Sequence, residues 1–101
     1  MEIINKKCIV RCDRAGVFFG TIASKNDTPA GVEVEIKDCR RLWYWSGAAS
    51  LSQMANEGVK NPSGCKFSVV VPQMIVTQVI EILPCSEEAV KNLESVPVWR
   101  V

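Results

Sequence analysis

The stretch Val32-Glu33-Val34-Glu35-Ile36-Lys37 decides the fold, because an aliphatic residue alternates with a charged one along its whole length. A period of two places successive side chains on opposite faces of a β-strand. A strand of this kind buries one face in a core and exposes the other to water, as in many antiparallel sheets. The stretch therefore predicts a half-buried strand in a β-rich domain.

Two more strands are expected on its N-terminal side. Residues 8–12 form a short apolar run that ends at the polar turn 13–16, where Gly16 can take the positive φ of a tight turn. Residues 17–22 form a second run, and residues 25–31 are rich in turn-forming residues. We expect a hairpin and then a turn that leads into the strand at 32–37.

Four extended segments are expected on its C-terminal side. Residues 42–45 continue the strand after a bend at 38–39, which places Leu42 and Tyr44 on one face and the two neighbouring tryptophans on the other. Residues 66–71 and 75–83 are two further strands, separated by Pro72-Gln73. Residues 96–99 form an extended tail or an edge strand, because proline is tolerated in a sheet only at such places.

Two short helices are also predicted. Ser50 and Gln53 match a capping box, so a helix should run from about 51 to 57 and end at Gly58. Ser86 is a suitable N-cap for residues 87–94, with acidic residues in the first turn, where the helix dipole favours them. Five or so strands and two short helices predict a single mainly β (α+β) domain over residues 1–101. The expected form is a small SH3-like barrel or a strongly curled antiparallel sheet.

The composition suits a folded soluble domain. It is 48% hydrophobic and 23% charged, with a formal net charge of +1, which argues against disorder and against strong nucleic-acid binding. The N-terminus lacks the apolar run of a signal peptide, and no stretch reaches the length of a membrane span. We therefore expect a protein that stays in the cytoplasm.

Neither catalysis nor a metal or cofactor is expected. The chain has no histidine, no recognised nucleophile motif, no phosphate-binding P-loop and no dinucleotide fingerprint. Its five cysteines include no C-x-x-C pair, so we interpret them as reduced, mostly buried side chains. Cys8 and Cys12 share one face of their strand, which leaves an incidental metal site as an alternative.

The run Arg40-Arg41-Leu42-Trp43-Tyr44-Trp45 is the main candidate for a binding site. Guanidinium groups bind phosphate bidentately, and aromatic rings stack on nucleobases. The run fits a structural role equally well, in which a tryptophan anchors the core or an oligomer interface and the arginines lie along it.

The following turn, Ser46-Gly47-Ala48-Ala49-Ser50, favours the binding interpretation, because small side chains and helix N-terminal amides suit an anion. A simple strand-to-helix turn is the alternative. The charged turn with Arg11 and Arg14 could converge on the same site or be a solvated loop. The predicted ligand-binding residues are Arg11, Arg14, Arg40, Arg41, Trp43, Tyr44, Trp45, Ser46, Gly47, Ser50 and Gln53.

Several of these segments together resemble a family of small uncharacterised-domain proteins from tailed phages and prophages. They are residues 11–20, the motif Arg-Arg-Leu-Trp-Tyr-Trp-x-Gly-Ala-Ala-Ser-Leu-Ser-Gln at 40–53, and residues 58–60 and 65–67. The resemblance implies expression in the host cytoplasm and a short list of roles. One is counter-defence, in which a homo-oligomeric sponge protein sequesters a cyclic-nucleotide or ADP-ribose-derived immune signal.

Three functions follow as hypotheses. The first is a homo-oligomer that binds a nucleotide second messenger, with an aromatic ring on the base and the arginines on phosphate. The second is a protein-interaction or structural accessory module that uses the same aromatic strip. The third is single-stranded nucleic-acid binding, which the near-neutral charge makes the weakest.

Overall fold

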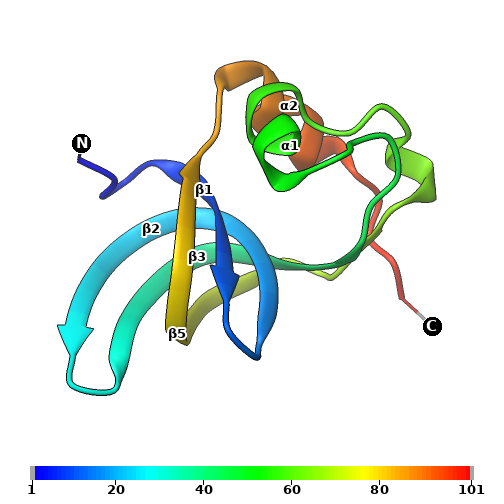
Figure 1. Cartoon of the computed structure of the whole chain (residues 1–101). Helices are drawn as coiled ribbons and strands as arrows, with labels where there is room; N and C mark the ends of the chain where they lie inside the picture. Colours follow the sequence, from blue (N-terminus) through cyan, green and yellow to red (C-terminus); the bar gives the residue numbers. More distant parts are fainter. Residues whose placement is uncertain (1, 101) are drawn as a thin grey trace.

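The computed structural model describes residues 2–100 and contains a curled sheet covered on one side by two helices (Figure 1). The strands within that range are β1 (Lys7–Cys12), β2 (Gly16–Thr28), β3 (Gly31–Tyr44), β4 (Lys66–Phe67) and β5 (Val71–Pro84). The helices are α1 (Leu51–Glu57) and α2 (Glu87–Ser95), with a 3-10 turn, η1 (Pro62–Gly64), between α1 and β4.

The sheet is antiparallel and strongly curled, which confirms the second of the two expected forms. Its strand order is β2-β1-β5-β3-β4, and β2 also pairs with β3. Among β1, β2, β3 and β5, each strand therefore pairs with two others, so these four strands form a closed circuit of pairings, and β3 also pairs with β4. Figure 1 shows β2 and β3 bending together around this curl.

Local irregularities allow the strands to bend. Asp38 in β3 has φ 51°, Gln78 in β5 has φ 56°, and the register of β2 against β3 shifts after Phe19. Gly20 lies at that shift, where an added Cβ would stand 2.5 Å from Ile36 Cγ2 and 2.9 Å from the Lys37 carbonyl oxygen. Only glycine allows β2 and β3 to approach this closely.

The strands carry two cores, one on each face. The inner core lies inside the curl and includes Val10, Phe18 and Ile36. The outer core lies between the sheet and the helices, where Phe19 and Leu42 pack with residues from α1 and α2. Within residues 2–100, none of the helices is long and apolar enough to cross a membrane.

Both helices begin and end close to their predicted bounds, and the expected extended tail is present. Ser50 Oγ accepts from the Gln53 amide, and Ser86 Oγ accepts from the Ala89 amide. The C-terminal tail meets the sheet at one parallel bridge between Val98 and Phe67.

The predicted turn at 25–31 was too long. The polar segment from Lys25 to Thr28 continues β2, because it pairs with residues 31–34 of β3, and only Pro29 and Ala30 form the turn. Strand propensity is set largely by such cross-strand partners and less by the composition of the segment itself.

The expected strands at 66–71 and 75–83 have different bounds. β4 ends at Phe67, and β5 begins at Val71 and includes Pro72. Pro72 stands opposite Asp38, whose positive φ already distorts the ladder, so the missing proline donor is tolerated there.

Candidate binding surface

Arg40 is a structural residue in this fold. It is 4% exposed and donates to three backbone carbonyls, from Nε to Ser68 (3.0 Å), from Nη1 to Leu93 (3.1 Å) and from Nη2 to Pro97 (3.4 Å). Burial lowers the pKa of its guanidinium below the ordinary value, yet arginine stays charged in proteins. Arg40 therefore ties β3 to the end of α2 and to the tail, and its donors face protein.

Arg41 points to the other face of β3 and is half-buried. Its Nη1 donates to the Ala15 carbonyl (2.8 Å), and its guanidinium carbon lies 4.8 Å from the centre of the Phe18 ring. The side chain thus links β3 to the β1–β2 turn.

The three aromatic residues of the run have different environments. Trp43 is 58% exposed and Tyr44 is 53% exposed, whereas Trp45 is half-buried and packs against the outer core. The expected alternation is wrong here, because the register of β3 against β4 shifts between Leu42 and Tyr44. The shift leaves two adjacent aromatic side chains exposed to solvent.

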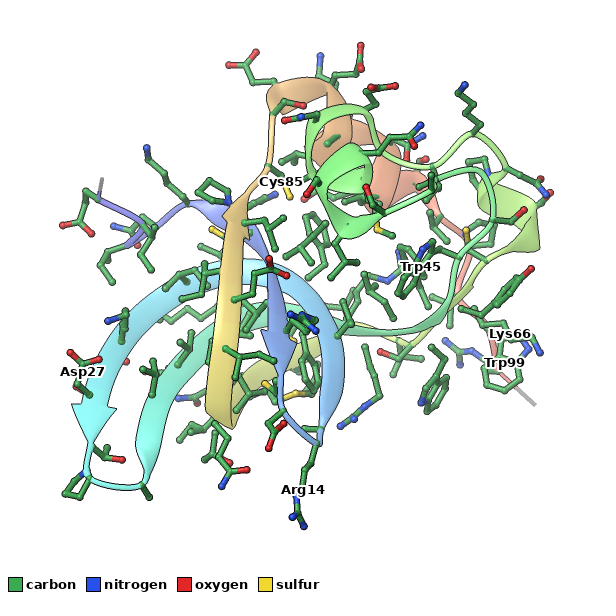
Figure 2. All side chains as sticks on the ribbon, in the orientation of Figure 1. Arg14, Asp27, Trp45, Lys66, Cys85 and Trp99 are labelled. Carbon is green, nitrogen blue, oxygen red and sulfur yellow. The ribbon has the colours of Figure 1, made fainter. Side chains whose placement is uncertain are left out.

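The tail completes an exposed aromatic surface around Trp43. The ring centroids of Trp43 and Trp99 are 5.2 Å apart at an interplanar angle of 85°. Lys66 Nζ lies 5.2 Å from the Trp99 ring centre, and Lys66 pairs with Tyr44 across the strands. Figure 2 shows Lys66 and Trp99 together beside the C-terminus. We define the aromatic surface as Trp43, Tyr44, Lys66, Val98 and Trp99.

Sequence reasoning placed Trp99 and Lys66 outside the site. Trp99 joins it because its amide donates to the Phe67 carbonyl (2.9 Å), which fixes the tail beside β4. The only local signal was a tryptophan next to the basic Arg100 in an extended tail. Nothing in the local sequence indicated that this tail lies against the run at 40–45.

The small-residue turn that was expected to hold an anion packs against protein. The Lys60 amide donates to the Gly47 carbonyl (3.1 Å), and the Asn61 amide donates to the Ser46 carbonyl (3.3 Å). A Cβ on Gly47 would stand 2.5 Å from the Lys60 nitrogen, so glycine is needed for this close chain-to-chain approach.

The N-terminus of α1 is capped by its own residues. Ser50 caps the Gln53 amide, and Gln53 Oε1 accepts from the Ala49 amide (2.9 Å), one residue earlier than a standard capping box. These two contacts use the side chains that were expected to bind a ligand.

The two arginines of the β1–β2 hairpin do not join the aromatic surface. Arg11 forms an exposed ion pair with Glu81 (3.1 Å), across the β1–β5 pairing. Arg14 is exposed at the turn and points away from the molecule, well apart from Trp99 (Figure 2). Of the predicted residues, Trp43 and Tyr44 are therefore the two that stand on one exposed surface.

The cysteines lie mainly in the cores, and the structure links none of these five described residues in a disulfide. Burial raises the pKa of the Cys8 thiol to about 11 and the pKa of the Cys39 and Cys85 thiols to about 12. Thiols with raised pKa values are poor nucleophiles at neutral pH. Among residues 2–100, no group of three acidic, cysteine or histidine side chains is placed to hold a metal ion.

Three hollows lie elsewhere on the described residues. Two hollows, of about 250 and 150 Å³, open at the end of the molecule formed by the β2–β3 hairpin and the middle of β5. A third, of about 220 Å³, lies between Lys25 and residues 79–82 of β5. None of these three hollows is lined by a predicted ligand-binding residue.

Comparison with known proteins finds a family but no individual relative. No curated protein and no solved structure matches the chain. One family model matches residues 5–93, which include all five strands and most of α2. The match covers most of the chain, and the chain therefore belongs to the family described as Domain of unknown function (DUF6948).

Proposed function

We propose that this protein is a non-catalytic interaction domain that docks a protein partner through the aromatic surface. The observation that carries the proposal is the exposure of Trp43 and Trp99 as a perpendicular pair on the surface. Tryptophan is enriched among the residues that dominate binding energy at protein interfaces. Exposed apolar clusters of this kind on a small domain commonly mark interaction sites.

The shape of the surface favours a protein partner over a small molecule. Small-molecule sites are usually concave, and the three hollows described above lie away from the aromatic surface. Of the donors that were expected to hold phosphate, the Arg40 guanidinium and the amides of Ala49 and Gln53 are engaged within the protein. In biological terms, we propose that the protein is either a structural accessory of a phage or an inhibitor of a host protein.

The proposal is tested by affinity capture from the cells that make the protein. The wild type is compared with Trp43→Ala and with the control Ile80→Ala, which removes a 54% exposed apolar side chain from β5. We expect a partner that the wild type and the control retain and Trp43→Ala loses. Identical sets of captured proteins for all three baits would contradict the proposal.

A nucleotide-derived immune signal is the second candidate, and one observation favours it. Lys66 places an ammonium group over the Trp99 ring, so a stacking face and a cation stand side by side on the aromatic surface. This candidate predicts thermal stabilisation by a cyclic di- or trinucleotide or by an ADP-ribose isomer, and loss of that stabilisation in Trp43→Ala. Thermal stabilisation by such a nucleotide, lost in Trp43→Ala, would support this candidate and contradict the protein-docking proposal.

A further inference from the structure

The hollows at the β2–β3 hairpin are lined by acidic side chains, whereas the aromatic surface carries a cation. Glu33 lines both the 250 Å³ and the 150 Å³ hollow, and Glu35 lines the smaller one. The remaining lining residues are uncharged, among them Ser24, Thr77 and Ile75. The two adjoining hollows, called here the hairpin hollow, therefore carry two carboxylates and no cation.

The hairpin hollow also has an apolar contact point. Ile75 is 64% exposed, the highest value among the large hydrophobic side chains of the described residues. Glu35 is held in place, because it accepts hydrogen bonds from Ser24 and Gln73. Glu33 takes part in none of the three ion pairs within residues 2–100, so its charge is available to a partner.

The aromatic surface complements the hairpin hollow in charge. It contains the cation Lys66 and no acidic residue, and its two tryptophans are both exposed to solvent. An indole is an apolar body with one N–H donor, which suits a hollow that offers an exposed isoleucine and carboxylate acceptors. Complementary charges of this kind specify partner and orientation.

The two features cannot meet within one molecule. Figure 2 shows Asp27, next to the hairpin hollow, at one end of the protein and Trp99 and Lys66 at the other. The longest extent of the molecule is 39 Å. A contact between the aromatic surface and a hairpin hollow therefore requires a second copy of the chain.

Resting on the proposed docking role, we propose that the partner of the aromatic surface is the hairpin hollow of a second copy, so that the chain associates head to tail. The Trp43–Trp99 pair enters the hollow against Ile75, and Lys66 lies beside Glu33. A head-to-tail contact uses two different patches, so it extends into a ring or a filament rather than stopping at a symmetric dimer.

The test is the mass distribution of the full-length protein in solution, measured by sedimentation velocity across a range of concentrations and salt. We expect reversible association that weakens as salt rises, because Lys66 is exposed and Glu33 is only partly buried, so salt screens the pair. Trp43→Ala disables one patch and Glu33→Lys the other. Each should weaken association by at least about tenfold, as loss of a central interface residue does. Glu57→Lys is the control, since Glu57 is exposed at the end of α1, where the helix dipole favours a cation.

Mixing the two variants gives the sharpest result. Each variant keeps one intact patch, so an equimolar mixture of Trp43→Ala and Glu33→Lys should form heterodimers and no larger species. A symmetric interface between aromatic surfaces would instead leave the mixture no more associated than its components, which would overturn the head-to-tail arrangement. Unchanged thermal unfolding of both variants confirms that they are folded.

A wild type that stays monomeric up to about 1 mM, the weak end of specific affinity, would overturn the inference. The broader docking role is decided separately by the capture experiment. A Trp43-dependent partner of different sequence would then show that the surface accepts another protein.

Discussion

Arg40 and Arg41 are neighbours in the sequence with opposite surroundings, because successive side chains of β3 point to opposite faces. Arg40 enters the outer layer and donates to three carbonyls, including that of Leu93 in the last turn of α2, where the helix dipole favours a cation. Arg41 closes the end of the curl over Phe18. Arg40 thus holds together three segments that are far apart in the sequence: β3, the residues after β4, and the end of α2 with the tail.

Replacing Arg40 by alanine should therefore destabilise the protein strongly. The change leaves three carbonyls without their donors and opens a cavity, so we expect the free energy of unfolding to fall by about 3 kcal/mol. Arg11→Ala is the matched control, because it removes an exposed ion pair whose loss costs less than about 1 kcal/mol. Urea unfolding measures both, and equal losses would refute a structural role for Arg40.

At the same scale, the sequence singled out one run as a candidate site but could not assign the places of its members. The run at 40–45 stays a prediction as a binding site, and the exposure of Trp43 and Tyr44 suits a surface role. Alternation separates Arg40 from Arg41, but the groups that bury Arg40 and half-bury Trp45 come from segments distant in the sequence. Such features are set by tertiary contacts, which a local pattern does not contain.

At the scale of elements, a single side chain of α2 joins the two helices. Asn92 Nδ2 donates to the Val59 carbonyl (2.8 Å), and its Oδ1 accepts from the Val59 amide (2.7 Å). Gly58, which ends α1 with φ 80°, lies so close that an added Cβ would stand 2.3 Å from Asn92 Oδ1. The end of α1 and the middle of α2 therefore fit only while residue 58 has no side chain.

Gly58→Ala and Asn92→Ala should thus be energetically coupled. Gly58→Ala alone costs about 3 to 4 kcal/mol, about 2 kcal/mol from backbone strain and the rest from displacement of Asn92. In the Asn92→Ala background the displacement is absent, so Gly58→Ala should cost about 1.5 kcal/mol less. A double-mutant cycle in urea unfolding measures the difference, and simple additivity would show that the two residues act independently.

Helices were easier to predict than strands for a related reason. The caps at Ser50 and Ser86 act within three residues, so the bounds of α1 and α2 follow from local sequence. The strands β2 and β5 exceed their predicted lengths, because their ends are stabilised by pairing with β3. For β5 that partner is distant along the chain, whereas for β2 it follows directly across the turn at Pro29 and Ala30, where the polar composition of residues 25–28 resembles a loop.

At the scale of the whole molecule, the two cores share the same strands. Ile9 and Phe19 face the outer core, whereas the adjacent Val10 and Phe18 face the inner core. Loosening one core displaces the strands that build the other. We therefore expect the protein to unfold as one cooperative unit, in which a perturbation inside the curl is detected in the helical layer.

Alkaline pH supplies such a perturbation through the buried thiols of the inner core. Burial raises the pKa of Cys39 from 9.0 to about 12, so the native state keeps its proton where the unfolded state has released it. The stability linked to this thiol is fully present below pH 9 and falls as pH rises toward 12, by about 1.4 kcal/mol per pH unit. Urea unfolding at pH 8 and pH 10.5 should show this loss.

The variant Cys39→Ala isolates the contribution of the Cys39 thiol to the pH dependence of stability. It also tests whether the two cores unfold cooperatively. The variant shares every other titrating group with the wild type, so its stability should fall less steeply above pH 9, although it starts about 1 kcal/mol lower. A background of Trp43→Phe and Trp99→Phe leaves Trp45 as the reporter of the outer core. Its fluorescence and the far-ultraviolet circular dichroism should give coincident transitions at both pH values. If the Trp45 transition were the same with and without Cys39→Ala, the inner and outer cores would unfold independently of each other.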